Sequence, residues 1–131
     1  MIIQEERNLY QSMSQEKLDI VFLEACEDND LEIVQYLLSA PELKIHANIH
    51  TKEDSGFIGA CINGNINLVK YLLSYPDLRE HADINAQNDE AFFMACIYKQ
   101  IEVLEYLIID KNIAVSDRLD NLLKTTHTQT V

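Results

Sequence analysis

The chain has 131 residues, enough to bury a hydrophobic core without help from a metal or a disulfide. Its hydrophobic fraction of 47%, with only 3 Gly and 2 Pro, excludes a disordered or collagen-like chain. The 22 Asp and Glu exceed the 10 Lys and Arg, and the net charge of −12 would repel nucleic-acid phosphates and an anionic membrane surface. We therefore expect one folded domain, monomeric, that binds neither nucleic acid nor membranes.

The first 13 residues are expected to form a cap over the domain that follows. They carry Glu5 and Glu6 where a secretory signal peptide needs basic residues. The longest apolar run, 91–98, is well short of the roughly 18 residues of a membrane span. Three cysteines, an odd number, fit a reducing compartment better than a disulfide framework. We therefore expect a cytoplasmic protein.

From about residue 14 onward, the chain is an internal repeat with a period of 35 residues. The segments ACEDNDLEIVQYLL, ACINGNINLVKYLL and ACIYKQIEVLEYLI follow one another at this spacing and align without a gap. The positions that match carry Phe, Ala, Cys, Tyr and Leu. They are Phe22, Phe57 and Phe92; Ala25, Ala60 and Ala95; Cys26, Cys61 and Cys96; Tyr36, Tyr71 and Tyr106; and Leu37, Leu72 and Leu107. We place the repeats at about 14–46, 47–81 and 82–116.

Each repeat predicts two helices joined by a tight break. In the second repeat, a first helix is expected over about 54–63, and a break follows at Gly64. Apolar residues at helical spacing then predict a second helix that ends before Pro76. Asp54 and Asp89 stand where an N-cap is wanted, because a side-chain oxygen there can accept a hydrogen bond from the first turn. Each helix pair leaves an apolar face that only a neighbouring pair can cover.

The period and the helix pairs resemble the ankyrin repeat, whose unit is about 33 residues of turn and two antiparallel helices. The likeness is carried by ADINAQ at 82–87, by AC at 60–61 and by GNINLV at 64–69. It implies an all-α fold, an ankyrin-repeat solenoid of stacked helix-turn-helix units. The family's Thr-Pro-Leu-His motif is replaced by SGFI at 55–58. The capping Thr and the His that ties neighbouring turns in the family are therefore missing, as in a divergent type with short turns, and the sequence leaves the hydrogen bonding between repeats open.

The C-terminal part is predicted to contain a second cap and a tail. Ser116 can begin a capping helix over about 116–124, and the polar segment 125–131 is expected to be flexible. A Thr-rich tail is also compatible with an export signal of a specialised bacterial secretion system.

The spacing of the cysteines, histidines and glycines does not indicate catalysis or metal binding. The three cysteines occupy equivalent positions of stacked repeats about 10 Å apart, too far for shared zinc bonds of about 2.3 Å. His46 and His50 are four residues apart, a spacing that suits a metal only on a helix, but they fall in a connector. His81 repeats His46, so we expect local hydrogen bonds there. No Gly-rich phosphate loop occurs. We expect no metal, no cofactor and no enzymatic activity.

The resemblance implies that a partner protein binds the concave side, formed by the turn tips and the first helices. The corresponding residues are Asn48, Thr51, Lys52, Glu53, Gln87, Asn88 and Asp89 in the tips, and Glu27, Asp28, Ile62, Asn63, Ile97 and Tyr98 on the helices. Alternatively, Ile97 and Tyr98 pack against the next repeat or the C-terminal cap.

The predicted function is that of a protein–protein interaction module. The negative charge would attract a partner with a basic surface. Two alternatives follow from the same features. One is an acidic inhibitor or regulatory subunit that covers a basic site; the other is a secreted bacterial effector that acts by binding a host protein.

Overall fold

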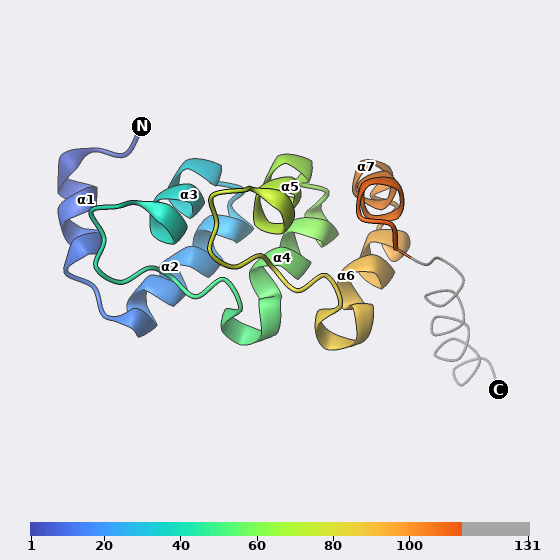
Figure 1. Ribbon diagram of the computed structural model, residues 1–131, viewed down its shortest axis with the longest axis horizontal. Helices are drawn as coiled ribbons and strands as arrows, with labels where there is room; N and C mark the ends of the chain where they lie inside the picture. Colours follow the sequence, from blue (N-terminus) through green and yellow to red (C-terminus); the bar gives the residue numbers. More distant parts are fainter. Residues whose placement is uncertain (114–131) are drawn as a thin grey trace.

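The structure, a computed structural model, describes residues 1–113, and these form helices and no strands (Figure 1). The helices are α1 (Gln4–Gln11), α2 (Gln15–Glu27), α3 (Leu31–Ser39), α4 (Thr51–Asn63), α5 (Ile66–Ser74), α6 (Ala86–Ile97) and α7 (Ile101–Glu105). A π-helical turn, Tyr106–Asp110, continues α7. The predicted all-α fold is confirmed. The predicted cap at 116–124 and tail at 125–131 lie outside the described residues.

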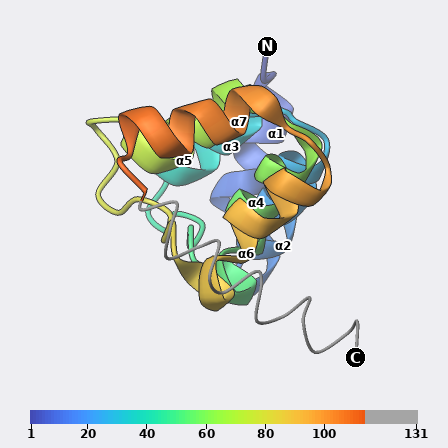
Figure 2. The ribbon, with the colours of Figure 1, turned by 90° about the vertical axis from the view of Figure 1, so that its right-hand side faces the viewer.

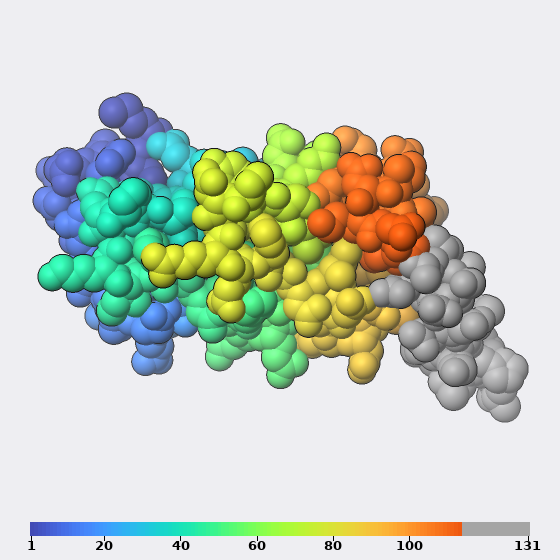
Figure 3. Space-filling model, viewed as in Figure 1, coloured from blue at the N-terminus to red at the C-terminus, as the bar shows by residue number. Residues whose placement is uncertain are grey.

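The helices form two rows. The first helices of the repeats, α2, α4 and α6, lie side by side in one row, and the second helices, α3, α5 and α7, form the other (Figures 1 and 2). Two long connectors, residues 40–50 and 75–85, run along one side of the stack (Figure 3). The long axis of the molecule therefore follows the repeats, as expected for a solenoid.

The core lies between the two rows and holds the side chains that repeat every 35 residues. Phe22 and Phe57 are fully buried and Phe92 nearly so. Leu37, Leu72 and Leu107 are also fully buried. An apolar side chain of this size stabilises the fold by roughly 1.5–3 kcal/mol when it is removed from water. The repeated positions are therefore the ones that hold the stack together.

A left-handed residue reverses the chain between the two helices of each repeat. Asn29, Gly64 and Lys99 occupy this position with φ of 55°, 71° and 57°. The next amide, for example that of Asp30, donates to the carbonyl of Ala25 at 2.8 Å, and this bond closes the first helix. Glycine suits the position because it lacks the Cβ that makes this conformation costly for other residues.

The two connectors are closed by matching hydrogen bonds. Nε2 of His46 donates to the carbonyl of Ala40, and Nε2 of His81 to that of Tyr75, both at 2.8 Å. The backbone amide of Ala82 also donates to the carbonyl of Leu72 at 2.9 Å. The predicted local role of these two histidines is confirmed.

Helix α1 lies at the N-terminal end of the stack, against the first repeat (Figure 1). The ring of its Tyr10 lies 5.8 Å from that of Tyr36. Arg7 Nη1 is 3.3 Å from Glu42 Oε1. The next helix, α2, is capped by Ser14, whose hydroxyl accepts a hydrogen bond from the Lys17 amide. The apolar surface of the first repeat is therefore partly covered at this end.

Candidate protein-binding face

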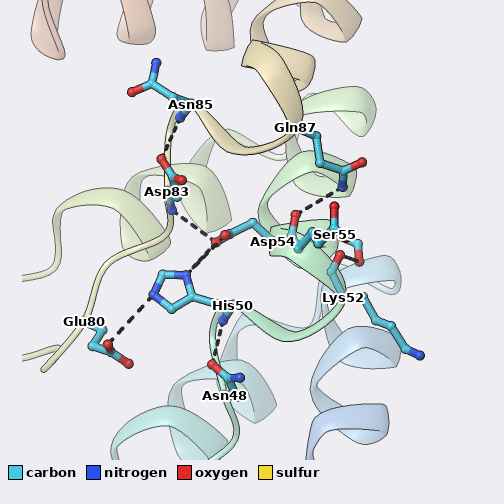
Figure 4. A network of polar contacts seen from close by, with 10 residues as sticks. Asn48, His50, Lys52, Asp54, Ser55, Glu80, Asp83, Asn85 and Gln87 are labelled. Atoms are coloured by element: carbon cyan, nitrogen blue, oxygen red, sulfur yellow. Dashed lines mark hydrogen bonds and ion pairs between the residues drawn. The ribbon is translucent and has the colours of Figure 1, made fainter.

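The second and third repeats are joined by a polar network around Asp54 (Figure 4). Asp54 is the one buried charged residue in 1–113, and its Oδ1 accepts from Nδ1 of His50 at 3.0 Å. The same oxygen accepts the backbone N–H of Asp83, in the following repeat, at 3.1 Å. Nε2 of His50 lies 4.0 Å from Oε1 of Glu80. One carboxylate therefore links two successive repeats.

The first two repeats are joined in the same way. Oδ1 of Asp19 accepts from the side-chain amide of Gln15 and from the backbone N–H of Asn48, both at 2.8 Å. In the third repeat, the side-chain amide of Asn85 donates to Asp89 at 2.7 Å. A donor at one position and an aspartate four residues later thus occur in every repeat.

These contacts answer one question that the sequence left open and correct one expectation. Hydrogen bonds between neighbouring repeats are present, because Asp19 and Asp54 form them in place of the family's usual Thr and His. The prediction that Asp54 caps the first turn of its helix is wrong, since its carboxylate accepts from His50 and from Asp83 of the next repeat.

The turn tips are short segments of left-handed backbone. Lys52, Glu53 and Asp54 have φ of 54°, 56° and 63°, and residues 87–89 repeat the pattern with 52°, 59° and 65°. Such a conformation costs roughly 1–2 kcal/mol for each residue with a Cβ. The side-chain amide of Gln87 donates to the carbonyl of Glu53 at 3.1 Å and ties the two tips together.

Several predicted tip residues are part of this internal structure. Asn48 accepts the backbone N–H of His50 at 3.0 Å, Gln87 bonds the neighbouring tip, and Asp89 accepts from Asn85. Thr51 is half-buried. Five of the predicted set are exposed at the tips: Asn48, Lys52, Glu53, Gln87 and Asn88.

The predicted helix residues lie on one face, which we call the first-helix face: the exposed side chains of α2, α4 and α6. Glu27, Asp28 and Asn63 are exposed there. Ile62 is partly buried against the core. The side chains of Ile97 and Tyr98, at the end of α6, are 59% and 57% exposed. The C-terminal cap against which Ile97 and Tyr98 are alternatively expected to pack lies outside the described residues.

The sequence reasoning missed one apolar residue of this face, Ile20 on α2. Ile20 is 49% exposed, although it is a large hydrophobic residue. Its equivalents 35 and 70 residues later are Ser55 and Glu90, so it does not belong to the repeated core. An apolar residue at a position that is polar in the other repeats was the available signal.

Buried thiols and hydroxyls are not arranged for chemistry. Burial raises the pKa of the Cys26 thiol to about 12, and it also raises the pKa values of Cys61 and Cys96. The Tyr71 hydroxyl lies 3.5 Å from Ser39 Oγ of the preceding repeat, and the Tyr106 hydroxyl contacts Ser74. Within residues 1–113, no three His, Cys, Asp or Glu side chains are grouped to hold a metal ion.

Comparison with known proteins identifies the repeat. A family model described as ankyrin repeats, three copies, matches residues 22–118. No curated protein and no solved structure matches the chain significantly. No described helix combines the length and the apolar character needed to cross a membrane. The match covers most of the chain and agrees with the stacked helix pairs, so the chain belongs to the ankyrin-repeat family, whose repeats generally act as protein–protein interaction modules.

Proposed function

We propose that this protein binds a partner protein through its first-helix face. The observation that carries the proposal is the exposure of Ile97 and Tyr98 side by side at the end of α6. Tyr is enriched among the residues that dominate binding energies, and an exposed pair of large apolar side chains gives a partner an area to bury.

The backbone around this pair is fixed, which favours binding. The Tyr98 amide donates to the Met94 carbonyl at 2.9 Å, and the Lys99 amide donates to the Cys96 carbonyl at 3.1 Å. Gln100 then donates its side-chain amide to the Ile62 carbonyl of the preceding repeat at 2.6 Å. A surface held in this way loses little conformational entropy when a partner binds, so more of the contact energy remains as affinity.

Rigid display of a surface, without catalysis, is the mechanism that fits these features. The partner would contact the first-helix face across successive repeats, with the tips at its edge. A specific complex would bury about 800 Å² on each protein.

The test compares two double variants with matched chemistry. Ile97→Ala with Tyr98→Ala removes the exposed pair, and Ile109→Ala with Tyr75→Ala removes the same residue types elsewhere, where they are 72% and 41% exposed. Circular dichroism should first show that both variants are as helical as the wild type. A partner is then captured from cells with the wild type, identified by mass spectrometry and purified.

We expect the purified partner to bind the Ile97 and Tyr98 variant at least tenfold more weakly than the wild type, and the control variant unchanged. Equal affinity of the Ile97 and Tyr98 variant and the wild type, or loss of binding only in the control, would refute binding through this face.

A further inference from the structure

Two adjoining hollows lie between α2 and α4 on the first-helix face. One has a volume of about 440 Å³ and is lined by residues that include Glu16, Ile20 and Lys52. The other, of about 240 Å³, lies over Cys26 and Gly59. Leu23 lines both hollows, so they form one groove with an apolar middle.

Two glycines of α4 line this groove, and only one of them is required by the fold. A Cβ on Gly56 would lie 3.1 Å from Cys26 Sγ and 3.1 Å from Phe22 Cε2, so glycine there lets α4 approach α2. A Cβ on Gly59 would meet nothing within 4 Å.

Nothing in the described chain therefore explains a glycine at position 59. It lies in the interior of a helix, where glycine is less stable than alanine, and its φ is not in the left-handed region. The same position holds Glu24 in the first repeat and Met94 in the third, so the stack accommodates large side chains there. Glycine suits a position that a bound molecule approaches closely, because it has no Cβ.

Two exposed carboxylates on α2 line this groove. Glu16 borders the larger hollow and Glu27 borders the smaller one. Among the described contacts, neither of the two side chains takes part in a hydrogen bond or an ion pair. Their charges are therefore available to a cationic group of a bound molecule.

We propose that this groove binds a basic segment of the partner protein, with an aliphatic side chain seated over Gly59 and a Lys or Arg beside Glu27. The inference rests on the proposed function, because it places part of the partner on the first-helix face. The hollow of about 240 Å³ over Gly59 suits one side chain of a protein segment. The carboxylates match a cation, and the apolar floor matches the aliphatic anchor.

Two pairs of single substitutions isolate the two parts of the groove. Gly59→Leu fills the hollow with a good helix former, and Asn67→Leu places the same residue at an exposed position of α5. Glu27→Gln removes one groove charge, and Glu102→Gln removes an exposed charge of α7. Because Gly59 has free space around it, Gly59→Leu should fold and raise the melting temperature by roughly 2–5 °C.

The probe is a random 12-residue peptide library on phage, selected against the full-length wild type, and the selected peptides are then synthesised and labelled. We expect them to contain an aliphatic residue flanked by Lys or Arg. Fluorescence anisotropy should show at least tenfold weaker binding to Gly59→Leu, several-fold weaker binding to Glu27→Gln at low salt, and unchanged binding to both control variants. Failure to select any peptide, selection of acidic peptides, or affinity for Gly59→Leu within twofold of the wild type would overturn the proposal.

The outcome is separable from that of the proposed function. A cellular partner that is lost by the Ile97 and Tyr98 variant but retained by Gly59→Leu would leave the first-helix face as the binding surface and refute the groove. Peptides that depend on Gly59, with a cellular partner that ignores Ile97 and Tyr98, would support the groove and refute the role of the exposed pair.

Discussion

Removal of the Asp54 carboxylate should weaken the contact between the second and third repeats more than any other single change at the tips. This carboxylate is 6% exposed and accepts both the His50 ring and the Asp83 amide. In Asp54→Ala the partly buried Asp83 amide loses its acceptor. The side chain of His50 is 36% exposed and can hydrogen-bond water instead.

The expected loss follows from these two bonds. A hydrogen bond to a charged group contributes about 1.5–3 kcal/mol, and we assign this to the Asp83 amide. The exposed His50 contact adds at most about 1 kcal/mol, because solvent screens it. Asp54→Ala should therefore lower the free energy of unfolding by about 2–4 kcal/mol.

Three further variants divide this loss into its causes. Asp54→Asn keeps an oxygen acceptor and a residue type that tolerates positive φ, so it should lose only about 1 kcal/mol. Asp54→Gly removes the side chain but relieves the left-handed strain, so it should lie between Asn and Ala. Glu53→Ala is the control: Glu53 is also left-handed and charged, but its side chain is exposed. It should change stability by less than about 0.5 kcal/mol.

Urea unfolding followed by circular dichroism measures these differences, and amide hydrogen exchange locates them. The Asp83 amide should exchange at least tenfold faster in Asp54→Ala than in the wild type. If Asp54→Ala behaves like Glu53→Ala, and the Asp83 amide exchanges at its original rate, then Asp54 does not join the repeats and the reasoning fails.

Three more predictions concern the repeated positions. Lys99→Gly should raise the free energy of unfolding by about 0.5–1 kcal/mol in urea titrations, because Lys99 has φ of 57° where the second repeat has Gly64. Gly64→Ala should lower the free energy of unfolding, since the added Cβ would collide with the side chain of Gln100. Because burial raises the pKa of Cys26 to about 12, almost no thiolate forms at pH 8, and iodoacetamide should modify Cys26 far more slowly than the half-buried Cys96. Mass spectrometry of timed samples checks this, and equal rates for Cys26 in the native protein and in urea would contradict it.

The period and the helix pairs were predictable because they depend on local patterns. The break at Gly64 follows from glycine's access to positive φ, and the structure places it between Asn63 and Ile66, where α4 ends and α5 begins. The burial of Phe57 followed from its recurrence at the same distance from each cysteine. Features that repeat with the core are visible in one sequence, because every repeat must solve the same packing problem.

The bonds between repeats were not predictable in the same way. The aspartates at 19, 54 and 89 recur with the correct period, but a carboxylate before a helix equally suggests an N-cap. The backbone N–H groups that bind Asp19 and Asp54 lie 29 residues further along the chain, and only the stacked structure brings donor and acceptor together. The donors Gln15, His50 and Asn85 share no identity, so no match in the sequence marked them.

The contrast between repeated and non-repeated positions also separates structure from recognition. Buried positions such as Leu37, Leu72 and Leu107 hold one residue type in all three repeats, because the stack dictates the shape of its core. The position of Gly59 holds Glu24 and Met94 in the other repeats, and stacking imposes no residue type there. The fold therefore leaves the residues of the first-helix face free to vary. Apolar, acidic and glycine residues can be combined there to match the shape of a partner without loss of stability.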